Sequence, residues 1–216
     1  MINLILASNS PRRKKIMKDM GLVYEVIPSN YDEKLEDDIF SYDKIEDLAT
    51  QKCLDVVRRI HEKNTTLTPN PSPEGRGEQA YLVLAADTVV VLHNKILGKP
   101  HTKENAYKML KELSGETHMV VTSICAINTK TNRAATISTT SYVRFTLWTD
   151  EMIQEYVNKY LPLDKAGSYG IQELPPNYLD KFEGSFENIV GLCPEAVATV
   201  LAKLDYPIQQ IHYQAD

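Results

Sequence analysis

The first thirteen residues restrict the fold more than any other segment, because an apolar run leads directly into a helix start. Residues 2–7 form a mainly apolar run of the length expected for a short buried strand. Ser10 followed by Pro11 predicts that a helix begins there, since serine caps helices and proline favours the first helical position. The helix is expected to continue to Met20 and to end at Gly21.

The same segment concentrates groups that bind anions. Arg12 and Arg13 fall in the first helical turn, where the helix dipole favours negative rather than positive charge. Together with unpaired backbone N–H groups and the hydroxyls of Ser8 and Ser10, these guanidinium groups suit a phosphate chain. A capped surface helix with solvated arginines explains the same residues, so both interpretations stay open at this point.

The rest of the chain alternates expected strands and helices. Asp87 and Thr88 follow the apolar strand at 81–86, a hairpin with its turn at 93–94 comes next, and a 130–132 turn joins two long later strands. The pattern predicts one α/β domain over residues 1–216, with a mixed, partly antiparallel central sheet flanked by helices. The expected strands cover 2–7, 22–27, 81–86, 117–128, 134–147 and 178–182, and the expected helices cover 11–20, 43–59, 103–113, 150–159 and 194–204.

One segment differs in composition from the packed domain. Residues 64–79 hold three prolines and two glycines and almost no apolar side chain, which predicts a flexible insert without a catalytic role. The helix before it is expected to begin at Ser41 or Asp43 and to end near Arg59.

Composition excludes several classes of function. The net charge of -5 argues against a general nucleic-acid-binding protein, which usually carries a basic excess. No apolar run approaches the roughly 20 residues that a membrane helix needs, and no signal peptide is recognisable. Cys53, Cys125 and Cys193 are widely spaced and odd in number, as expected of reduced thiols rather than a disulfide framework. We therefore expect a cytoplasmic protein with no membrane or nucleic-acid polymer as partner.

Two acidic positions are candidates for catalysis or metal binding. Asp87 follows a buried strand, and carboxylates at strand ends line the crevice where α/β sheets bind ligands. A local turn cap is the alternative role for this side chain. Glu33 lies in an acidic loop, and a carboxylate pair opposite a phosphate pocket would suit Mg²⁺.

Four further positions are open to a structural or a functional interpretation. Lys52 falls on or beside the apolar stripe of its helix, so it either extends to the rim or points into a charged cleft. Lys99 could bind phosphate as a point charge, or it could be a solvated turn lysine. Gln172 follows a loop with glycines at 167 and 170 and could read a base edge, whereas His118 is interpreted as structural.

Six segments, taken together, resemble the Maf family of nucleoside triphosphate pyrophosphatases. They occur in the family's order and span nearly the whole chain. The resemblance implies hydrolysis of dTTP and UTP, and of modified pyrimidine nucleotides, between the α and β phosphates. It also implies a fold like that of inosine triphosphate pyrophosphatases, with two lobes around a cleft. The segments are residues 6–13 (LASNSPRR), 86–90 (ADTVV), 97–100 (LGKP), 113–118 (LSGETH), 164–172 (DKAGSYGIQ) and 187–192 (ENIVGL).

The resemblance also implies roles for individual residues. Asp87 matches the general base, and Glu33 matches an acidic position beside a divalent cation, which would be Mg²⁺, Mn²⁺ or a similar ion, with Asp87 as a second ligand. The positions expected around the phosphates are Ser8, Arg13, Lys52 and Lys99, and those expected to select a pyrimidine base are Arg12, Thr88 and Gln172.

Two departures and two alternatives remain. The insert at 64–79 is longer than the family's usual segment, and Cys193 replaces a usual proline. One alternative is a pyrophosphatase for 7-methyl-GTP or for a broader set of nucleotides. The other is a nucleotide-binding regulator of cell division with little catalysis, although such a protein would not need both Glu33 and Asp87. A homodimer is the commonest assembly for an enzyme of this kind.

Overall fold

The computed structural model describes residues 2–32, 37–66 and 79–206. Glu33 and most of the insert at 64–79 therefore lie outside the described residues. The helix before the insert is longer than expected, because it continues to Thr66 rather than ending near Arg59.

The described residues form a seven-stranded mixed sheet. Its order is β2-β1-β3-β5-β6-β7, with β4 paired to β3 beyond the end of β1. β1 is parallel to β2 and β3, and the other pairs are antiparallel. The sheet is therefore mixed and partly antiparallel, as the sequence predicted. The strands are β1 (Asn3–Leu6), β2 (Glu25–Val26), β3 (Tyr81–Leu92), β4 (Lys95–Leu97), β5 (Thr117–Asn128), β6 (Ala134–Phe145) and β7 (Leu179–Glu183).

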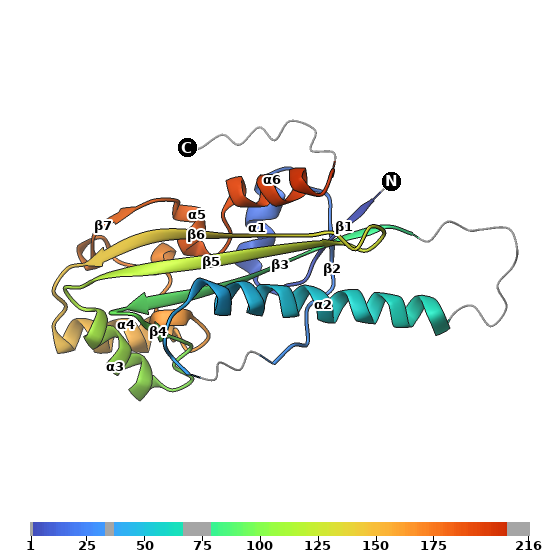
Figure 1. Ribbon diagram of the computed structural model, residues 1–216. Helices are drawn as coiled ribbons and strands as arrows, with labels where there is room; N and C mark the ends of the chain where they lie inside the picture. Colours follow the sequence, from blue (N-terminus) through green and yellow to red (C-terminus); the bar gives the residue numbers. More distant parts are fainter. Residues whose placement is uncertain (1, 33–36, 67–78, 207–216) are drawn as a thin grey trace, which may run out of the picture.

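Helices cover both faces of this sheet (Figure 1). α1 and α6 pack on one face and the long α2 on the other, while α3 and α4 pack together towards the far end. Among the described residues, no helix is long and apolar enough to cross a membrane. The helices are α1 (Pro11–Asp19), α2 (Tyr42–Thr66), α3 (Lys103–Leu113), α4 (Asp150–Tyr160), α5 (Phe186–Val190) and α6 (Pro194–Lys203).

Alternation along the central strands explains this layered core. Leu82 and Leu84 pack in the cluster beneath α1 and α6, whereas Val83 and Ala85 pack against α2. Successive side chains of a strand point to opposite faces, so a continuous apolar run is needed where both faces are covered. A separate cluster around Trp148 packs beneath α3 and α4 at that end of the sheet.

The middle of β3 departs from the sequence prediction in a way that matters for function. Asp87 was expected at the end of a strand, but β3 continues without a break to Leu92. β1 pairs with residues 81–84 and β4 with residues 90–92, so a gap opens along this edge between them. Asp87 therefore borders a cleft because its neighbouring strands stop short, and not because its own strand ends.

Most local predictions are confirmed. Ser10, Thr102 and Thr149 cap α1, α3 and α4 through side-chain hydrogen bonds, and the His93-Asn94 turn joins β3 to β4. The strand expected at 22–27 is wrong in extent, since only Glu25–Val26 pairs with β1. Four short elements were not predicted from the sequence, because they are too short to show a periodic pattern. They are α5 and the 3-10 turns Ala166–Ser168, Ile171–Glu173 and Pro176–Tyr178.

Candidate active site

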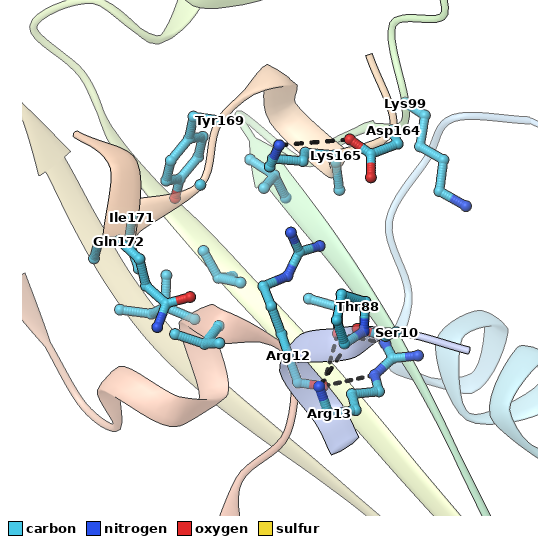
Figure 2. A pocket seen from close by; sticks show the side chains of 18 of the residues that line it. Ser10, Arg12, Arg13, Thr88, Lys99, Asp164, Lys165, Tyr169, Ile171 and Gln172 are labelled. Atoms are coloured by element: carbon cyan, nitrogen blue, oxygen red, sulfur yellow. Dashed lines mark hydrogen bonds and ion pairs between the residues drawn. The ribbon is translucent and has the colours of Figure 1, made fainter. Parts of the chain in front are cut away.

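A cleft of about 430 Å³ lies where the gap beside β3 meets the N-terminus of α1. Its opposite wall comes from the loop at 164–173, and α5 closes one end. Every predicted site residue that the structure describes lines this cleft, although the residues come from five separate parts of the chain. These residues are Ser8, Arg12, Arg13, Lys52, Asp87, Thr88, Lys99 and Gln172. Figure 2 shows five of them, Arg12, Arg13, Thr88, Lys99 and Gln172.

A buried ion pair lies at the base of the cleft. Lys52 of α2 donates to the Oδ1 atom of Asp87, and the two residues are only 7% and 6% exposed. Lys52 thus points into the charged cleft rather than to the rim. Burial of a charge is costly unless an opposite charge accompanies it. The charge of Lys52 therefore explains why Asp87 can be buried, and the charge of Asp87 explains why Lys52 can be buried. The pair brings a cation and a proton-accepting carboxylate to the same place.

The N-terminus of α1 faces the same cleft. Ser10 accepts a hydrogen bond from the backbone N–H of Arg13 at 3.4 Å, and its own N–H donates to Ser8 Oγ at 3.2 Å. Pro11 has no backbone N–H to donate. The positive end of the helix dipole and the hydroxyls of Ser8 and Ser10 therefore lie together at the start of α1. Arg12 points into the cleft from this turn (Figure 2). The arrangement suits a phosphate group.

Arg13 connects three walls of the cleft. Its Nε donates to Gly191 O at 2.9 Å, and its two terminal nitrogens donate to Ser8 Oγ at 3.3 Å and to Thr88 Oγ1 at 3.0 Å. Thr88 in turn lies 3.0 Å from the hydroxyl of Thr122, which donates to the carbonyl of Asn188 in α5. Arg13 therefore fixes the positions of α1, β3 and α5 while its positive charge lies at the cleft.

The opposite wall contains charged residues that were not selected from the sequence. Lys165 is only 9% exposed, and its Nζ lies 3.5 Å from Asp164 and 3.4 Å from Glu173. All three line the cleft. The loop reaches this position because Gly167 adopts φ +65° directly against Val90. The sequence identified the loop as a place for a ligand, but a lysine next to an aspartate gives no local sign of burial.

His118 lies behind the cleft rather than in its lining, in agreement with its interpretation as structural. Its Nε2 atom is 2.8 Å from the hydroxyl of Tyr169, which does line the cleft. The ring packs edge-on against Phe145. Burial lowers the pKa of His118 to about 3, so the imidazole stays neutral at physiological pH.

Metal binding by protein groups alone is not supported in the described part of the chain. No group of three or more histidine, cysteine, aspartate or glutamate side chains converges there, and the three cysteines are buried free thiols. Mg²⁺, however, is commonly bound through one or two carboxylates plus substrate phosphates and water. The Asp87 carboxylate, in the same cleft as the N-terminus of α1, fits that mode of binding.

The chain is similar to known proteins over nearly its whole length. A family model described as Maf-like protein matches residues 3–204. A protein of Acetivibrio thermocellus is 38% identical over 192 residues, which cover 89% of this chain and 90% of the relative. Proteins of Caldicellulosiruptor saccharolyticus and Clostridium perfringens are 34% and 36% identical, and each match covers at least 96% of both chains. All three relatives are named dTTP/UTP pyrophosphatase.

Proposed function

The chain belongs to the Maf-like protein family, and we propose that it hydrolyses dTTP and UTP to the nucleoside monophosphate and pyrophosphate. The names of its relatives support this reaction. The observation that carries the proposal is the buried Lys52–Asp87 pair, which faces the anion-binding start of α1 across one cleft. Hydrolysis of a phosphoanhydride needs charge neutralisation and a positioned water more than covalent chemistry. In this proposal Lys52 supplies positive charge and Asp87 accepts a proton from the water.

In this proposal, the triphosphate lies against the start of α1. The hydroxyl of Ser8 and the backbone N–H groups of that turn donate to phosphate oxygens, and Lys52, Lys99 and Arg13 neutralise their charge. Asp87 takes a proton from the water that attacks the α phosphorus, and pyrophosphate leaves. Fixed cations reduce the barrier because negative charge builds up on the leaving group.

The residues that select the base are proposed from the same placement. Arg12, Thr88 and Gln172 all line the cleft, with Gln172 on the wall opposite Thr88 (Figure 2). Thr88 is held by Arg13 and Thr122, so its contribution depends on that hydrogen-bond network.

We also propose that the reaction requires a divalent cation, with Mg²⁺ as the first candidate and Mn²⁺ as a substitute. Asp87 would hold this cation together with phosphate oxygens, and Glu33 is the second carboxylate expected from the sequence. When bound, the cation would neutralise phosphate oxygens and help to orient the triphosphate.

The deciding experiment measures pyrophosphate release from a panel of nucleoside triphosphates, with Mg²⁺ and with EDTA. We expect release from dTTP and UTP that disappears in EDTA. Asp87→Asn should lower turnover about 10²–10⁴-fold, the usual contribution of a general base. Asp47→Asn, on the exposed side of α2, is the matched control and should retain activity. Full activity in a folded Asp87→Asn protein would remove Asp87 from the mechanism.

The same panel separates the alternatives. Preference for 7-methyl-GTP, or equal turnover of all nucleotides, would replace the pyrimidine assignment. Binding of nucleotide without release would favour a regulator. We further propose that the protein forms a homodimer and that it is located in the cytoplasm. The three free thiols support a reducing compartment such as the cytoplasm. Light scattering during gel filtration tests the dimer, and a monomeric mass would reject it.

A further inference from the structure

The outer edge of β6 is open over most of its length. β7 pairs only with residues 142–145 of β6, so residues 134–141 have a strand neighbour on the β5 side alone among the described residues. Residues 135–140 are all half-buried, whereas residues 120–128 of β5 are all buried. Because α2 and α6 contact β6 from opposite faces of the sheet (Figure 1), the exposure lies along the strand edge.

Two hydrogen bonds show which backbone groups of β6 point outward. Asn128 N donates to Arg133 O at 3.0 Å, and Phe145 N donates to Glu116 O at 3.2 Å, at the two ends of the β5–β6 ladder. Along an antiparallel ladder, residues that bond to the neighbouring strand alternate with residues whose backbone points away. The odd-numbered residues of β6 therefore bond to β5. The N–H and C=O groups that point outward are those of Ala134, Thr136, Ser138 and Thr140.

This open edge lacks the usual protection against pairing with another chain. No hydrogen bond joins its outward backbone groups to any residue that the structure describes. Exposed edge strands commonly carry a lysine, a proline or a bulge that prevents such pairing. Residues 134–141 (AATISTTS) contain no charge and no proline, and the irregularity in β6 comes later, between Arg144 and Phe145. The edge can therefore accept a further strand.

A second copy of this chain fits the edge through the same strand. Two such edges can run antiparallel about a two-fold axis that passes through Ile137, and a two-fold axis gives a closed assembly. Ala134 then faces Thr140 of the other copy, and Thr136 faces Ser138. Every pair joins two outward residues, so each pair can exchange two backbone hydrogen bonds. The edge is thus complementary to itself.

The surroundings of the edge also suit a second copy. In this pairing Arg133 of one copy lies next to the end of β7 in the other, where Glu183 carries the opposite charge, and both side chains are exposed. Tyr42 and Tyr142 are 45% and 46% exposed, and the Tyr42 hydroxyl lies 3.0 Å from Oγ1 of Thr140 at the edge. Tyrosine is enriched at protein interfaces. Charge and aromatic exposure therefore favour the same partner.

We propose that residues 134–140 of β6 pair with the same residues of a second copy and join the two sheets into one; this inference rests on the homodimer proposed above. None of these residues lines the cleft, which is formed by a single copy. The pairing therefore leaves the site open to substrate and is not needed for UTP hydrolysis.

Hydrogen exchange of the wild-type protein, resolved to single amides, tests the pairing directly. The measurement is made at protein concentrations below and above the dissociation constant of the dimer, which light scattering provides. We expect the amides of Thr136, Ser138 and Thr140 to exchange more slowly in the dimer, because each gains a hydrogen bond. The amides of Ile137 and Thr139 already bond to β5, so their exchange should change less.

A proline variant tests the same hydrogen bonds. Thr136→Pro removes one outward N–H from each copy and leaves the bonds to β5, since proline is tolerated where the N–H of an edge strand points away. The dissociation constant of the dimer should rise about 30-fold, as for the loss of two hydrogen bonds. Thr136→Val keeps the N–H and the side-chain shape, so it is the matched control and should not change the constant. Ala134→Pro, at the exposed start of β6, replaces Thr136→Pro if that variant does not fold.

The outcomes separate this inference from the proposed function. A dimer in which the 134–140 amides exchange as in the monomer, or which Thr136→Pro does not weaken, would overturn the pairing and leave a homodimer through another surface. Slow exchange of these amides in a monomer would assign the edge to another segment of this chain, and it would also overturn the pairing. A monomeric mass at every concentration would overturn the pairing and the homodimer. UTP hydrolysis is measured separately, and its absence would contradict the proposed reaction alone.

Discussion

His118 gives the structure a dependence on pH that can be calculated and measured. The residue is 1% exposed in β5, and Nε2 makes its hydrogen bond with Tyr169 while Nδ1 has no partner among the described residues. The imidazolium form would place a charge among Phe145 and its aromatic neighbours, and burial therefore lowers the pKa of His118 from 6.5 to about 3.

The sign of the effect follows from proton binding. Between pH 6.5 and about 3, the unfolded chain protonates His118 and the folded chain does not, so the free energy of unfolding falls as the pH falls. From pH 7 to pH 5 this contribution amounts to about 2 kcal/mol, since one pH unit within the window corresponds to about 1.4 kcal/mol.

Urea unfolding at pH 7 and pH 5 measures this quantity. His118→Gln carries no titrating group, so its stability should decrease by about 2 kcal/mol less than that of the wild-type protein over this interval. Carboxylates contribute equally to both proteins and cancel in the comparison. The same pH dependence in His118→Gln and wild type would refute the assignment of a buried neutral imidazole.

Two further predictions concern the cleft. Lys52→Met should lower the free energy of unfolding by about 3 kcal/mol, because it leaves the buried carboxylate of Asp87 without its cation. Adding Asp87→Asn to this variant should restore most of the lost stability. Urea unfolding of both variants checks this, and a double variant no more stable than Lys52→Met would contradict it. Gly21→Ala should cost about 1 kcal/mol, since φ is +72° but nothing lies within 4 Å. Gly167→Ala should cost more and slow UTP hydrolysis, because its Cβ would meet Val90 at 2.8 Å; equal stability of the two alanine variants would exclude this clash.

The sequence by itself determined the elements whose signals are local. Ser10, Thr102 and Thr149 predicted helix starts because a cap needs only a side chain and an N–H two or three residues away. The turn at His93-Asn94 was predicted for a similar reason, since its geometry depends on two residues. The alternation of strands and helices then gave the mixed sheet.

Eight of the residues that line the cleft were also predicted, although their arrangement was not. The family resemblance named eight described residues that the fold brings to one place, but it gave no relation between them. The sequence left Lys52 open between rim and cleft because its position beside an apolar stripe permits both. Only the packing of α2 across β3, which places it against Asp87, resolved the choice.

Tertiary structure alone decided where the strands stop and what meets across the cleft. Asp87 borders a cleft because β1 and β4 end on either side of it, and strand ends depend on pairing partners that lie far apart in sequence. Lys165 and Glu173 became visible as a pair only once the loop had folded over Gly167 and Gly170. Burial and ion pairing are properties of the assembled surfaces, and no periodicity or local motif encodes them.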